Sequence, residues 1–147
     1  MSNSSRPFRR RPLSRRNARF GVAAVEFAVC LPVIMLVVFA SIEASSMIFL
    51  KIDLQATAYE AARVGAAPTG TSADAINRGN EVLTQRNVHG GTVQTNPTDI
   101  TTVAVGGQFT VTVTAPISSN RVIAAWFFSG SNLTASTVMV REGTSAH

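Results

Sequence analysis

One apolar run constrains what this chain can fold into. Residues 22–42 contain a single acidic residue, Glu26, and no basic residue. A helix crosses the hydrocarbon core of a bilayer with roughly 20 apolar residues, so the run is long enough for one membrane span. A carboxylate in hydrocarbon is costly unless it finds a partner. The run therefore predicts a membrane helix in which Glu26 has a purpose beyond anchoring.

Positive charge is concentrated before this run. Residues 1–19 hold seven of the 13 basic residues and no acidic residue, whereas the remainder holds six basic and eight acidic residues. A basic arm can bind nucleic acid. Because this arm adjoins a membrane-length run, the excess of positive charge on the cytoplasmic side of membrane helices explains it better. We expect no nucleic-acid partner, a disordered and cytoplasmic segment 1–19, and an extracytoplasmic C-terminal part.

A long helix is predicted from about Val22 to Ala67. Pro32 removes a backbone hydrogen bond and is expected to bend this helix, which membrane helices tolerate. Glu43 is expected near the outer membrane surface, where a charge costs little. Beyond it an apolar face recurs at steps of three and four residues, formed by Met47, Leu50, Leu54, Ala58 and Ala61. The signals that end the helix are Gly65, Pro68 and Gly70.

The rest of the chain predicts a short helix followed by strands. Thr71 and Asp74 have the spacing of a capping box, which opens a helix that runs to about Asn87 and that Gly90-Gly91 stops. Residues 109–115 alternate between apolar residues and threonine, the pattern of a half-buried strand that Pro116 ends. Two further strands are expected at 100–105, joined through the turn Gly106-Gly107, and at 133–141. The apolar stretch 122–128 fits helix or strand.

These elements predict an α+β fold. A long N-terminal helix, transmembrane in its first half and amphipathic in its second, would be followed by a small antiparallel β-sheet. The sheet can bury one face only by packing on the amphipathic half of the helix. We expect a leader over 1–21, a transmembrane helix over 22–44 and an extracytoplasmic α+β domain over 45–147.

The sequence contains no catalytic or metal-binding constellation. His89 and His147 lack a Cys, Asp or Glu at ligand spacing, and we expect both to be exposed loop residues. Cys30 is the only cysteine, so no intrachain disulfide can form. We therefore expect no enzyme activity, no metal and no cofactor.

Glu26 has two interpretations, one without a function and one with a function in assembly. It could be a carboxylate tolerated at the membrane surface. Alternatively, a cut of the peptide bond between Gly21 and Val22 gives Val22 a positive α-amino group, about one helical turn before Glu26. In a staggered assembly, the amine of one subunit would approach the carboxylate of its neighbour. Such a pair in low dielectric would set the axial register between subunits more than it would add net stability.

The order of these features resembles a type IV prepilin processing site. A basic leader ends in Gly21, four small or apolar residues follow, and Glu26 and the aromatic Phe27 precede an apolar helix. The string is closer still to TadE-like minor pseudopilins of the tight-adherence (Tad/Flp) pilus system. Residues 55–65, with their Ala-Arg pair, and residues 133–142 resemble later parts of that family. Phe27 stands where many members of the wider Flp pilin group have Tyr.

The resemblance implies a pseudopilin-like fold and a function in assembly. A prepilin peptidase would cut after Gly21 on the cytoplasmic side, leaving Val22 as the first residue of a single-pass inner-membrane subunit. The partners would be that peptidase, other Tad pilins and pseudopilins, the Tad inner-membrane platform proteins and the lipid bilayer. The protein would take part in assembling Tad/Flp pili, which serve adhesion and biofilm formation.

Two other functions remain open on the residues alone. The chain could be a signal-anchored extracytoplasmic binding module in which Glu26 is incidental. It could also be a secreted protein cut by ordinary signal peptidase after Ala40, although Glu26 and Pro32 make a poor signal core.

Overall fold

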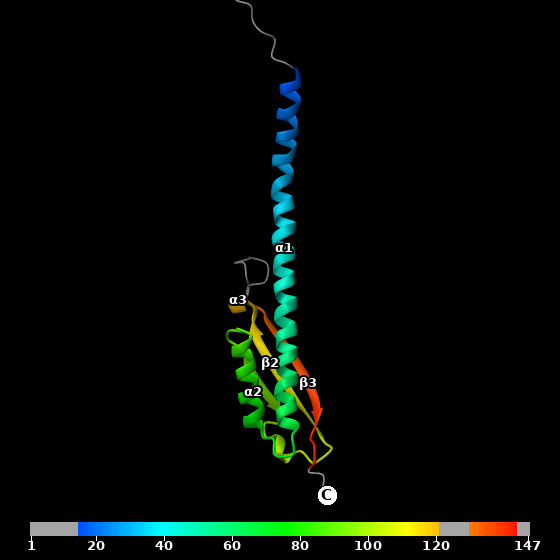
Figure 1. The fold of residues 1–147 in the computed structure, drawn as a ribbon, viewed down its shortest axis with the longest axis vertical. Coiled ribbons are helices and arrows are strands. Elements are labelled where there is room, and N and C mark those ends of the chain that lie inside the picture. Colours follow the sequence, from blue (N-terminus) through cyan, green and yellow to red (C-terminus); the bar gives the residue numbers. More distant parts are fainter. Residues whose placement is uncertain (1–14, 121–129, 144–147) are drawn as a thin grey trace, which may run out of the picture. The chain divides into compact units, whose positions relative to one another are not determined.

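The computed structural model describes residues 15–120 and 130–143, with side chains from Gly21 onward. The chain divides into two compact units, Met1–Phe39 and Ala40–His147. The second unit contains the C-terminal part of the long helix, a shorter helix and a three-stranded antiparallel sheet. The predicted α+β arrangement, a long N-terminal apolar helix with a small antiparallel sheet, is confirmed (Figure 1).

Helix α1 extends over Arg15–Ala66 and is continuous through Pro32. Its end agrees with the prediction to one residue, but its start lies seven residues before the expected Val22. The expectation of disorder is therefore wrong for residues 15–19, while residues 1–14 lie outside the described part of the chain. Arginine is a good helix former, and adding residues to an existing helix costs little compared with nucleating one.

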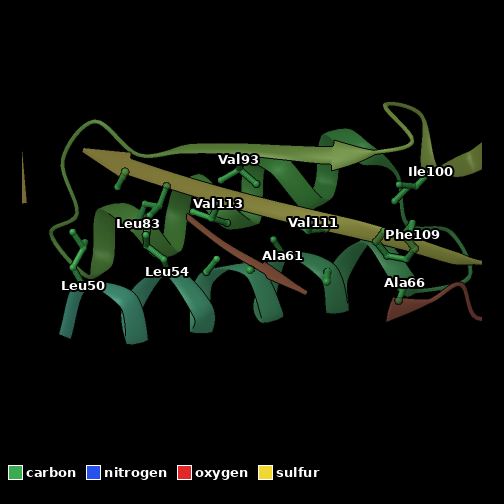
Figure 2. Packing of buried hydrophobic residues seen from close by; sticks show 14 residues of the cluster. Leu50, Leu54, Ala61, Ala66, Leu83, Val93, Ile100, Phe109, Val111 and Val113 are labelled. Atoms are coloured by element: carbon green, nitrogen blue, oxygen red, sulfur yellow. The ribbon is translucent and has the colours of Figure 1, made fainter. Parts of the chain in front are cut away.

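The second half of α1 provides one wall of the core. Leu54, Ala58 and Ala61 are fully buried, whereas the predicted first member of this face, Met47, is only half-buried. Figure 2 shows the buried side chains of α1 pointing toward β2. Small residues predominate on this face, which allows the sheet and the second helix to approach α1 closely. The core members contributed by α1 are Leu50, Leu54, Ala58, Ala61, Ala62 and Ala66.

Helix α2 spans Ser72–Gln85 and begins with the predicted capping box. The Thr71 hydroxyl accepts a hydrogen bond from the Asp74 N–H at 3.2 Å, and the Asp74 carboxylate accepts one from the Thr71 N–H at 3.1 Å. The helix ends earlier than Gly90-Gly91, because Asn87 adopts φ 57°. The N–H of Val88 then donates to the Leu83 carbonyl at 2.9 Å, which completes a Schellman-type cap. The residue that ends α2 is therefore Asn87, whereas the sequence pointed to Gly90 and Gly91.

Gly79 lies at the contact of α2 with the core. A Cβ at this position would lie 2.8 Å from the Val93 Cγ2 and 3.4 Å from the Ala61 Cβ. Both neighbours are buried and Val93 is stiff at χ1. The missing side chain therefore allows α2 to pack against β1 and α1 together.

Gly79→Val is expected to lower the free energy of unfolding by about 1–3 kcal/mol through overpacking. The measurement is urea unfolding of the full-length protein in detergent, followed by circular dichroism. Asn80→Val places the same β-branched residue at the neighbouring exposed position of α2 and serves as the control. Equal effects of the two substitutions would show that helix propensity, and not packing, sets the cost.

The sheet has the strand order β1-β2-β3, with both neighbouring pairs antiparallel. Its strands are β1 (Thr92–Asn96), β2 (Gln108–Pro116) and β3 (Asn132–Val140). The central strand β2 alternates as predicted and ends at Pro116. Its inward side chains bury against α1 and α2, and the last strand β3 lies one residue from its predicted position. The inward residues of β2 are Phe109, Val111, Val113 and Ala115.

The predicted hairpin through Gly106-Gly107 is wrong. Strand β2 pairs instead with β1, where Val93 lies opposite Val113, and on its other edge with β3. Residues 100–102 instead form the 3-10 helix η1 (Ile100–Thr102), whose N-cap is Asp99. Ile100 is fully buried and fills the core beside Phe109. Burial of the Ile100 side chain and the Asp99 cap stabilise this segment without strand pairing.

The strand β2 leads directly into the short helix α3 (Ile117–Asn120). The Asn120 side chain accepts a hydrogen bond from the His89 N–H at 2.7 Å and donates to the His89 carbonyl at 2.8 Å. It thereby ties this segment to the connection between α2 and β1. The apolar stretch 122–128 lies outside the described residues.

Asp99 gives this unit a pH-dependent contribution to stability. Hydrogen bonds from the Thr101 hydroxyl and from the Thr101 N–H lower the pKa of Asp99 below its ordinary 3.8, and the charge of Arg141 acts in the same direction. Because the folded pKa lies below the unfolded one, the contribution is complete above the ordinary pKa. It is lost as the pH falls through the folded pKa.

Asp99→Asn is therefore expected to lower the free energy of unfolding at pH 7. Below the ordinary pKa of 3.8, the difference from the wild type should shrink progressively. Urea unfolding of the full-length protein at a series of pH values measures this. A difference that stays constant across the series would contradict a role for the Asp99 charge.

Candidate processing and assembly site

The N-terminal half of α1 exposes an almost continuous apolar surface. Every residue from 21 to 42 is exposed, and 60% of Val22, 61% of Phe27 and 70% of Val29 is accessible. Contiguous apolar surface of this size marks a membrane or protein contact. By length and composition α1 is the one helix of the described residues that could span a membrane, which fits a single-pass anchor.

Gly21 lies within α1 and has no packing role there. A Cβ at this position would meet no other atom within 4 Å. A glycine inside a helix costs roughly 0.5–1 kcal/mol relative to alanine. The fold of this chain therefore gives no reason for a glycine at this position, directly before Val22.

Glu26 has no hydrogen bond or ion pair with any residue that the structure describes. It is exposed on α1, and its neighbours Val25 and Phe27 are exposed and apolar at 65% and 61%. Val22 lies four residues before it, on the same side of the helix. A carboxylate that has no partner among the described residues and lies on an apolar surface is suited to receive a positive charge from another subunit.

Glu43, which the sequence placed near the outer membrane surface, is buried within the fold. Glu43 is only 4% accessible, and its Oε1 has no hydrogen-bond partner within the part of the chain that the structure describes. Glu43 lies seven residues before Leu50, so both occupy the buried face of α1. That spacing is the signal that could have revealed its burial.

Titratable and metal-binding side chains are the other candidates for a site among the described residues. No group of three or more His, Cys, Asp and Glu residues within them could hold a metal. A hollow of about 180 Å3 between α1 and the end of α2 contains Asp53 and Arg86, which pair with each other at 2.7 Å. Cys30 is free and exposed, and His89 lies exposed in a loop as predicted. His147 lies outside the described residues.

A comparison with protein families supports the resemblance to TadE-like proteins over part of the chain. The family model described as TadE-like protein matches residues 21–63. This segment is similar to TadE-like proteins. The match begins at Gly21, includes Glu26 and Phe27, and ends within the buried half of α1. No curated protein matches the chain, and no solved structure matches it.

The TadE-like match suggests a role in the Tad pilus system. TadE-like proteins are pilus components and not a known enzyme family. The matched segment also contains the helix that fits a membrane anchor. Together the match and the anchor are consistent with association with other Tad pilus components at a membrane.

Proposed function

We propose that this chain is a minor pseudopilin that takes part in assembling Tad/Flp pili for adhesion and biofilm formation. A prepilin peptidase cuts the peptide bond between Gly21 and Val22, and the mature subunit begins at Val22. The Val22 amine of one subunit then pairs with Glu26 of a neighbouring subunit, and Phe27 packs beside this pair. The observation that carries the proposal is the carboxylate of Glu26, which has no partner among the described residues and lies on an exposed apolar helix inside the TadE-like segment.

Two further observations support this assignment. A side chain at Gly21 would meet no neighbouring atom within 4 Å, so packing does not require a glycine there. Recognition of the glycine by a processing peptidase explains it better. The seven basic residues before position 20 favour a cytoplasmic N-terminus. The protein would then lie in the inner membrane with its sheet on the extracytoplasmic side, in contact with other pseudopilins and the Tad platform proteins.

A deletion strain tests the function itself. Loss of this chain is expected to remove Tad pili and to reduce surface attachment, and the wild-type gene is expected to restore both. The pili are counted by electron microscopy. Normal pili in the deletion strain would favour the alternative, a signal-anchored extracytoplasmic binding module whose Glu26 is incidental.

A further inference from the structure

The charged side chains of α1 leave one long exposed stretch that carries no charge. Glu26 is exposed, whereas the next charged residue along the helix, Glu43, is only 4% accessible. The first exposed charge after Glu26 is therefore Lys51. The stretch between these two exposed charges, residues 27–50, is about 36 Å long at the helical rise of 1.5 Å per residue.

This stretch extends beyond the expected span of 22–44 and has the length of a bilayer core with one headgroup layer. The hydrocarbon core is about 30 Å thick, and each headgroup layer adds about 5–7 Å. A carboxylate without a partner avoids hydrocarbon, so in the unassembled subunit the core is expected to begin after Glu26. Since about 20 helical residues cross the core, its outer boundary lies near Ser46. Residues 47–50 then lie in the headgroup layer.

The polar side chains near this outer boundary do not require water. The hydroxyl groups of Ser45 and Ser46 donate to the carbonyls of Ser41 and Ile42, four residues back, at 2.8 and 2.9 Å. Such hydrogen bonds satisfy a serine within its own helix. Glu43 lies on the buried face of α1 and is not presented to lipid. The exposed surface of this part of α1 is therefore compatible with a bilayer.

Exposed apolar side chains beside the boundary cover a broad arc of α1. Ile48 and Phe49 are 60% and 66% accessible, and consecutive residues point about 100° apart around a helix. Ile52, which is 54% accessible, points between them. We call these three residues the membrane-proximal patch. A coiled partner helix covers a narrow seam, whereas lipid contacts every exposed side of a helix, so the breadth of the patch favours lipid.

We propose that the membrane-proximal patch lies in the headgroup layer of a phospholipid bilayer, so that the extracytoplasmic domain contacts the membrane. Lipid is the expected occupant because the patch continues the uncharged surface of the membrane anchor. Lys51, beside the patch, donates to the Thr134 carbonyl of its own domain. The proposal rests on the proposed function only in taking α1 as a membrane anchor, and it needs neither processing nor a second subunit.

Spin-label collision measurements on the full chain test this contact, in liposomes of phosphatidylcholine and phosphatidylglycerol. Ile48→Cys, Phe49→Cys, Tyr59→Cys and Asn77→Cys are each made with Cys30→Ser and labelled with a nitroxide. Oxygen concentrates in the bilayer, whereas a nickel chelate stays in water. We expect oxygen to relax the labels at positions 48 and 49 more than nickel does, and the order to reverse at positions 59 and 77.

The two control positions separate lipid from water and from protein. Asn77 is exposed on α2 and reports the aqueous phase. Tyr59 lies seven residues after Ile52 on the same side of α1, about 10 Å further along the helix, so a covering helix would protect both. Frequent nickel collisions at positions 48 and 49, as at 77, would overturn the proposal. Rare collisions with both reagents at positions 49 and 59 would also overturn it, because a protein would then cover the patch.

The N-terminal mass of the protein from its native membranes distinguishes this proposal from the proposed function. A Val22 start together with labels exposed to water rejects the lipid contact alone. Labels exposed to lipid in a chain that is uncut in its native membranes reject only the processing.

Discussion

Glu26→Ala is expected to abolish Tad pilus assembly while leaving the protein inserted in the membrane and folded. Glu26 makes no hydrogen bond or ion pair within the described residues, so its removal costs the fold of this chain little. In the assembled state the Val22 amine of a neighbour would lose its counter-charge. Leaving one charge of a buried pair without its partner costs about 3–5 kcal/mol.

Electron microscopy of pili, together with membrane fractionation of the variant, measures this expectation. Val25→Ala changes the adjacent exposed residue of the same helix and is the matched control. It should retain pili. Normal pili from Glu26→Ala would remove the assembly role of this carboxylate and leave it a tolerated surface charge.

Phe109→Ala is expected to have the largest effect on stability, lowering the free energy of unfolding by about 3–5 kcal/mol. Phe109 is 1% accessible at the start of β2, in the core shared by α1, Ile100 and the sheet. Domains of this kind are stable by about 5–15 kcal/mol in total, so the variant would lose a large share of its stability.

Urea unfolding of the full-length protein in detergent measures the loss. Val138→Ala truncates a 57% accessible residue on β3 and should change the free energy of unfolding by less than about 0.5 kcal/mol. Similar losses in the two variants would contradict the assignment of Phe109 to the core.

The elements with strong periodicity were predictable from the sequence. The apolar face of α1, the alternation of β2 and the capping box of α2 each follow from local spacing, and the structure contains all three. The amphipathic half of α1 was also the one surface on which the predicted sheet could bury its apolar face. These features depend on neighbours in the chain, which the sequence displays directly.

The features that the sequence did not reveal depend on distant contacts. Strand β1 is polar and short, and its pairing with β2 is evident only once Val93 is placed beside Gly79. Ile100 looked like part of a strand because its burial comes from packing beside Phe109. Glu43 was expected near the outer membrane surface because it follows the apolar run, whereas its burial depends on packing of the face of α1 that it shares with Leu50.

The candidate site was predicted as a set of residues, and the structure adds their surroundings. Gly21, Val22, Glu26 and Phe27 were chosen on their order along the chain, and the TadE-like match covers all four. Their exposure, and the absence of contacts to Glu26 within the described residues, could not be read from that order.

The N-terminal mass of the membrane-bound protein tests the central claim most directly. It should be measured with and without the prepilin peptidase of the host. The account predicts a chain that starts at Val22 when the peptidase is present and an uncut chain when it is absent. A Met1 start in both strains would contradict processing, and a start at Ser41 would identify a secreted domain released by ordinary signal peptidase.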